Sequence, residues 1–115
     1  MLAREYRLTK DRDFTKVYKL GSGGHSRFFS AKSLKNKMEV SRFGISVSLD
    51  VSKKSTVRNL LKRRVKAVIF ENLSTLRQGY DVVIRIKKEA VGKEFAELKN
   101  DLEFLLKKLE LLRKY

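Results

Sequence analysis

The side chains that could do chemistry in this chain are concentrated in a basic stretch from Lys53 to Lys66. The stretch reads KKSTVRNLLKRRVK and holds seven lysines and arginines and no acidic residue. Lysine and arginine side chains pair with phosphate groups, which nucleic acids carry at high density. The stretch therefore predicts binding of a polyanion.

The same stretch has the hydrophobic spacing of an amphipathic helix, with an apolar stripe opposite a basic side. The apolar stripe comprises Val57, Leu61, Val65 and Val68, and the polar side comprises Arg58, Asn59, Lys62, Arg63 and Lys66. Arg64 falls near the apolar stripe, so we expect it to extend along the edge of the core. We expect a hydroxyl of Ser55 or Thr56 to cap the helix start, and the helix to end near Asn72 or Leu73.

The charge of the whole chain supports a nucleic-acid partner. There are 28 lysines and arginines against 13 acidic residues, which gives a formal charge of +15 over 115 residues. A charged helix face is often merely solvated, but solubility does not require this large an excess. A membrane surface is a second possible polyanion, yet it needs a free apolar helix face, and the apolar faces here are needed for a core.

The sequence also indicates where in the cell the protein is expected and which cysteine chemistry it lacks. The segment from Met1 to Arg7 lacks the apolar run of a signal peptide, and no stretch has the length of a spanning helix, so we expect a cytoplasmic protein. The chain has no cysteine, which excludes disulfides, thiolate chemistry and cysteine-ligated zinc.

The elements that position the basic stretch can be placed by their periodicity, and they fit one domain over residues 1–115. We expect a helix from Asp11 to Leu20, ended by Gly21 in a left-handed conformation, and then a flexible glycine-rich loop through Gly24. The expected strands are 28–33, 40–48 and 80–86, and the expected last helix spans 94–114.

The last helix carries an apolar row at alternating spacings of three and four. The row comprises Phe95, Leu98, Leu102, Leu105, Leu109 and Leu112. It fits the face of a sheet better than a dimeric coiled coil, because fewer than four heptads are present. The order helix, two or three strands, helix, strand, helix predicts an α+β single-domain, two-layer sandwich.

Four segments in the right order resemble the bacterial ribonuclease P protein subunit over nearly the whole chain. They are Phe14-Thr15-Lys16-Val17-Tyr18-Lys19-Leu20-Gly21, Arg27-Phe28-Phe29, Arg42-Phe43-Gly44-Ile45-Ser46-Val47-Ser48 and Arg58-Asn59-Leu60-Leu61-Lys62-Arg63-Arg64-Val65-Lys66. The last segment is the most specific, because it contains the Arg-Asn-x-φ-Lys-Arg signature. Each of the other segments alone is a weak signal.

The resemblance implies a ribosomal-protein-like fold with a left-handed βαβ crossover. It also implies a monomeric subunit in a 1:1 ribonucleoprotein, which binds the catalytic RNA and helps it remove the 5′ leader of precursor tRNA. Phosphodiester hydrolysis would then belong to the RNA and its Mg²⁺ ions, with no metal site on the chain. One histidine, no cysteine and no recognisable carboxylate cluster agree with this division. His25 fits a plain surface residue, and Asp11 and Asp13 fit a helix start.

Two RNA-facing surfaces follow from the resemblance. The expected contacts to the catalytic RNA are Lys53, Lys54, Arg58, Asn59, Lys62, Arg63 and Lys66. The expected leader-binding cleft, between the first helix and the sheet, holds Phe14, Tyr18, Arg27, Phe29 and Lys32. Aromatic rings there would stack on bases without selecting a sequence. Packing in the core is an equal alternative for Phe14, and Tyr18 is the better candidate.

The sequence departs from the family pattern at three places. Lys32 occupies a strand position that is often aromatic, which substitutes an electrostatic contact for stacking. Leu60 stands where a further arginine often follows Arg-Asn, and Leu49-Asp50 replaces a frequent lysine pair. Other functions remain open on composition alone: a ribosomal or other structural RNA-binding protein, a DNA-binding module, or a nuclease that acts without RNA.

Overall fold

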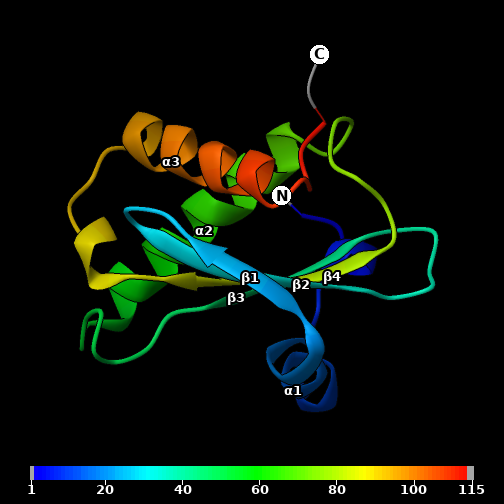
Figure 1. The fold of residues 1–115 in the computed structure, drawn as a ribbon. Helices are drawn as coiled ribbons and strands as arrows, with labels where there is room; N and C mark the ends of the chain where they lie inside the picture. The colour runs from blue at the N-terminus through cyan, green and yellow to red at the C-terminus, as the bar shows by residue number, and fades with distance from the viewer. Residues whose placement is uncertain (1, 114–115) are drawn as a thin grey trace.

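A four-stranded sheet with helices on both faces forms the fold in the computed structural model, which describes residues 2–113 (Figure 1). Helix α1 lies on one face, and α2 and α3 cover the other. The elements are η1 (Arg4–Tyr6), α1 (Asp11–Leu20), β1 (Ser22–His25), β2 (Phe29–Lys35), β3 (Arg42–Ser46), α2 (Ser55–Glu71), β4 (Tyr80–Ile86), η2 (Lys88–Ala90) and α3 (Phe95–Lys108). The predicted α+β single domain is confirmed, and α1 adds a helix to the second face of the sheet.

The strands lie in the order β1-β2-β4-β3. β1 pairs with β2, and β2 with β4, in antiparallel fashion, whereas β3 and β4 are parallel. Parallel neighbours need a crossover connection, and α2 supplies it. The sheet thus contains the βαβ unit that the resemblance implies, and its left hand stays a prediction.

Alternation along β4 divides the interior into two parts. Val82, Ile84 and Ile86 face α2 and α3 and belong to the large core. Val83 points to the other face, where it packs with Leu8 and Val17 beneath α1. The predicted strand 80–86 is confirmed, and the smaller cluster attaches α1 to the sheet.

Helix α2 buries the predicted apolar stripe, with Leu61, Val65 and Val68 each at most 3% exposed. The helix begins at Ser55. The predicted cap by Ser55 or Thr56 is wrong, because Lys54 occupies the N-cap position and no side chain caps the helix. Instead, the Ser52 hydroxyl accepts a hydrogen bond from the Lys54 N–H at 3.2 Å, before the first turn. The basic helix is therefore held by packing of its apolar side.

Helix α3 packs its leucines into the core, as predicted in preference to a coiled coil. It ends at Lys108, however, six residues earlier than the predicted end at residue 114, which lies outside the described residues. Glu110 has φ 61°, and the Leu111 N–H donates to the Leu106 carbonyl at 2.9 Å, a pattern that stops a helix. Leu112 is still buried because the chain after the turn runs beside Leu76.

The glycine-rich segment is a strand and not the predicted loop. Ser22–His25 pairs along β2, and Gly21 has φ −78°, so the predicted left-handed helix end is also wrong. A Cβ added at Gly21 would lie 2.6 Å from the Val17 carbonyl oxygen and 2.8 Å from the Ser33 carbonyl oxygen. Glycine is therefore required there by the close approach of backbone, and not by its φ.

In the part of the chain that the structure describes, no helix has both the length and the apolar character needed to cross a bilayer.

Candidate nucleic-acid interface

The basic face of α2 points away from the sheet and is accessible to a partner. Asn59 and Arg63 are exposed, and Lys62 and Lys66 are half-buried. The ion pairs found among residues 2–113 join Arg42 to Asp13 and Asp81, and Lys99 to Glu71. Within those residues, none of the lysines and arginines of this face has a carboxylate within 4.0 Å. The face is therefore free to pair with phosphates.

Two arginines of α2 also have structural contacts. Arg58 donates from Nη1 to the Ser52 carbonyl oxygen at 2.8 Å, which fastens the loop before the helix. A guanidinium has five donors, so Arg58 keeps capacity for a second partner. Arg64 is half-buried and donates from Nη1 to the Lys93 carbonyl oxygen at 2.7 Å, in agreement with its expected place at the edge of the core.

A groove of about 580 Å³ lies on the α1 face of the sheet. Its lining comprises Tyr18, Gly21, Gly23, Gly24, His25, Ser30, Ala31, Lys32, Val83 and Arg85. Two of the predicted cleft residues, Tyr18 and Lys32, meet here. Tyr18 is 37% exposed, and Lys32 donates from Nζ to the Tyr18 carbonyl oxygen at 2.8 Å. The groove thus offers an aromatic ring beside a cation, and its lining contains no acidic residue.

Phe14 does not line this groove. Its ring lies against Gly44 of β3, where an added Cβ would overlap Phe14 Cζ. The half-buried ring packs on the cluster of Leu8, Val17 and Val83. Of the two readings left open for Phe14, the structure favours core packing: the residue seats α1 on the sheet, and glycine at position 44 makes room for it.

Phe29 and Arg27 are also absent from the groove, contrary to prediction. Phe29 is 1% exposed and belongs to the core under α2 and α3, so it points to the opposite face of the sheet from Lys32. Arg27 lies before β2, with its Cζ 5.3 Å from the ring centre of Phe28 and its N–H directed at Asp101 on α3. A shift of one position along a strand reverses the face, and this accounts for the error at Phe29.

Three groove residues had not been predicted as binding residues: His25, Ser30 and Arg85. Arg85 lies out of phase with the inward residues of β4, and this alternation is the signal that could have identified it. Ser30 and Arg85 also line an adjoining hollow of about 240 Å³ together with Lys87 and Lys88. Cations therefore continue past the carboxyl end of β4, in a hollow whose lining also includes Asp50.

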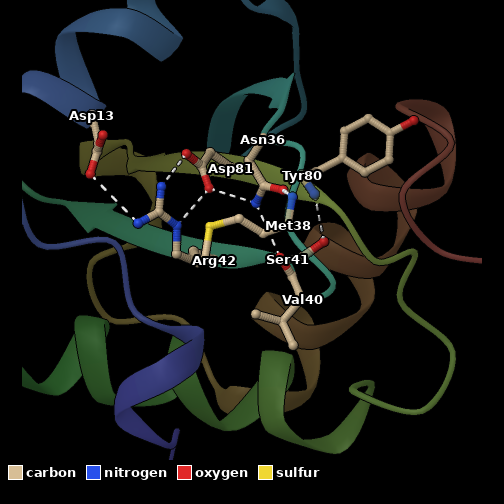
Figure 2. Close-up of polar contacts among 8 residues, drawn as sticks. All are labelled: Asp13, Asn36, Met38, Val40, Ser41, Arg42, Tyr80 and Asp81. Carbon is tan, nitrogen blue, oxygen red and sulfur yellow. Dashed lines mark hydrogen bonds and ion pairs between the residues drawn. The ribbon is translucent and has the colours of Figure 1, made fainter.

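The position of α1 is fixed by an ion pair as well as by Phe14. Arg42 binds Asp81 of β4 through two hydrogen bonds and lies 3.6 Å from Asp13 in the first turn of α1 (Figure 2). The hydrogen bond to Asp81 is the main cause of a raised pKa for Arg42, so the guanidinium stays charged. This network holds the start of α1 over the parallel pair of strands β3 and β4.

Among residues 2–113, no three histidine, cysteine, aspartate or glutamate side chains gather closely enough to hold a metal ion. The donor set in this part of the chain does not fit a dedicated metal site.

Comparison with known proteins gives a consistent result. The family model described as Ribonuclease P matches residues 2–110. A ribonuclease P protein component from a Cyanothece species is 34% identical over 131 residues, covering 100% of each chain. The solved ribonuclease P protein of Thermotoga maritima has a TM-score of 0.82 and 32% identity, covering 89% of this chain and 96% of that one. That of Staphylococcus aureus has a TM-score of 0.88 and 28% identity, covering 94% and 98%.

Proposed function

This chain belongs to the ribonuclease P protein family, and on that premise we propose that it holds the catalytic RNA on α2 and the 5′ leader of precursor tRNA in the groove beside α1. Membership makes the chain a tRNA-processing subunit that associates with the RNA of ribonuclease P. A family match over residues 2–110 leaves no separate support for the ribosomal, DNA-binding and RNA-independent nuclease alternatives.

The observation that carries the proposal is the presence of two basic surfaces on different faces of one sheet. The basic face of α2 presents cations without carboxylate partners among residues 2–113, which suits the backbone of a folded RNA. Asn59 is exposed in the middle of this face and can donate and accept hydrogen bonds at a ribose hydroxyl or a base edge. Lys53 and Lys54, both exposed, extend the face beyond the start of α2.

The groove suits a single strand whose sequence varies. Tyr18 offers a ring for stacking, which stabilises about 1–3 kcal/mol per base and tolerates any base. Lys32 and Arg85 supply charge for the backbone of the same strand, and the adjoining hollow with Lys87 and Lys88 extends its path. The leader is thus held by stacking and charge, without hydrogen bonds that select bases.

The chemical step belongs to the RNA in this proposal. Mg²⁺ ions bound mainly by the RNA would supply the activation of the attacking water, and the protein contributes binding and orientation. The chain acts as a monomer in a 1:1 complex. Its contribution to catalysis is largest where Mg²⁺ is scarce, because its cations replace part of the screening that the metal otherwise supplies.

Reconstitution tests the proposal. The catalytic RNA is assayed for cleavage of a precursor tRNA at low Mg²⁺, with and without the chain, and cleavage should rise when the chain is present. No gain at any Mg²⁺ concentration would contradict the proposed function. The chain alone serves as a control, and cleavage by it would move the chemistry to the protein.

A further inference from the structure

A third basic surface lies at the end of the molecule where β4 begins, apart from α2's basic face and from the groove. Two adjoining hollows of about 470 and 530 Å³ meet there and share Arg77 and Arg113. Lys35 and Lys37 line the first hollow. We call Lys35, Lys37, Arg77 and Arg113 the end cluster.

The chain end and the loop before β4 hold two members of the end cluster in place. Leu76 and Leu112 form an antiparallel bridge, and both side chains are buried. The Arg77 N–H donates to the Leu111 carbonyl at 2.8 Å, and the Arg113 N–H donates to the Thr75 carbonyl at 2.9 Å. The two arginines are therefore carried on paired backbone, although their side chains reach solvent.

The loop between β2 and β3, which carries Lys37, is fixed by the hydrogen bonds of Asn36. Asn36 donates from Nδ2 to Asp81 at 2.9 Å and to the Val40 carbonyl at 3.1 Å, and it accepts from the Met38 N–H at 2.8 Å (Figure 2). Lys37 lies inside this turn with φ 61°, a conformation that a lysine adopts only when its surroundings impose it. The turn therefore holds Lys37 at the rim of the hollow.

Ser41 joins the two loops. It is 2% exposed, and its hydroxyl donates to the Arg77 carbonyl. The same hydroxyl accepts from the Tyr80 N–H at 3.0 Å (Figure 2). The Ser41 N–H in turn donates to Gln78 Oε1 at 3.0 Å. The backbone positions that carry the four cations are thus fixed relative to one another before any partner binds.

The charges of the end cluster are not neutralised within the described structure. Among residues 2–113, none of its four members has a carboxylate within 4.0 Å, and the lining of the two hollows includes one acidic residue, Glu110. Several cations fixed at separate points of an open surface match a chain of phosphates better than a single small anion.

We propose that the end cluster binds the sugar–phosphate backbone of the catalytic RNA, as a contact additional to α2; this inference rests on the proposed function. The chain passes from the end of α2 to Arg77 within six residues, so the cluster lies within reach of an RNA docked on α2. The leader groove instead extends past the other end of β4, toward Lys87 and Lys88. The cluster is therefore assigned to the catalytic RNA and not to the leader.

Tethered cleavage tests this assignment, since a chain without cysteine allows a single attachment point. An iron chelate that generates hydroxyl radicals is attached at Lys37→Cys, at Leu60→Cys on the outer side of α2, and at Ala96→Cys on the exposed side of α3 as a control. We expect localised cuts in the catalytic RNA from positions 37 and 60. Cuts from 60 without cuts from 37 would overturn the inference and leave the proposed function standing, whereas no cuts from 60 would overturn α2 docking itself.

A charge-removal series gives an independent measurement. Arg77→Ala with Arg113→Ala should reduce the slope of log K against log salt by about 1.4–1.8 for binding to the catalytic RNA, because two phosphate contacts are lost. Arg4→Ala with Lys10→Ala removes the same charge from exposed positions near the other terminus and should leave the slope unchanged. Equal slopes for the two pairs would contradict a contact at the cluster.

Discussion

The guanidinium of Arg42 donates two hydrogen bonds to the carboxylate of Asp81, from Nε at 2.9 Å and from Nη2 at 2.7 Å. Asp81 is 7% exposed, and a paired fork of this kind is among the stronger polar contacts in proteins. Through Arg42, Asp81 connects α1 to the sheet. Through Asn36, Asp81 also connects the loop that carries Lys37 to β4. One buried carboxylate thus supports both the groove and the end cluster.

Asp81→Asn should lower the free energy of unfolding by about 1–3 kcal/mol, because the buried charge partner of Arg42 is lost. Urea denaturation measures the change. Asp50→Asn is the matched control, since Asp50 is exposed and its replacement should cost less than about 0.5 kcal/mol. Equal losses for the two variants would show that the Arg42–Asp81 pair does not stabilise the fold.

Gly44→Ala should destabilise the protein by about 1–3 kcal/mol, because the new methyl group overlaps the ring of Phe14. Denaturation is again the measurement. The same substitution in a Phe14→Leu background should cost less, since the shorter side chain leaves room for the methyl group. If Gly44→Ala destabilised the Phe14→Leu variant by the same amount, the strain would not arise between residues 14 and 44.

Tyr18→Ala should weaken binding of precursor tRNA by about 5- to 150-fold relative to mature tRNA, if the ring stacks on one base of the leader. Tyr18→Phe keeps the ring and should retain the preference. Binding of both RNAs to the reconstituted complex, together with the thermal midpoint of each variant, provides the readout. A lower midpoint with the preference intact would assign Tyr18 to packing.

Lys62→Ala with Arg63→Ala should flatten the salt dependence of catalytic-RNA binding by about one unit per lost phosphate contact. The fold should be unaffected, because neither side chain makes an ion pair among residues 2–113. Arg58→Ala should in addition lower stability, as it removes the bond to the Ser52 carbonyl. A salt slope equal to that of the unmodified chain would show that the RNA lies elsewhere.

Long periodic segments allowed most of the fold to be predicted. The bounds of α1 and β4 and the start of α2 agree with their predicted residues, because each has apolar residues at a regular spacing. β1 had no such signal: serine and glycine have low strand propensity, and the segment is a strand because it pairs with β2. The early end of α3 could not be predicted either, because Leu112 continues the apolar row after the helix has ended.

The candidate site was only partly predictable. Helical spacing placed the basic face of α2, whereas the groove depends on which strand residues face α1. Phe29 and Lys32 differ by three positions and therefore point to opposite faces, and sequence alone did not say which face each takes. The end cluster joins residues from three distant segments, so only the folded chain brings it together.

The sheet between α2 and the groove has a consequence for substrate geometry under the proposed function. A four-stranded sheet resists bending, so the ribozyme and the leader would be kept at a constant separation, in a molecule measuring 36 × 34 × 25 Å. A leader would then gain the protein's help only when it is long enough to reach Tyr18, and truncating it nucleotide by nucleotide should reveal that length as a step.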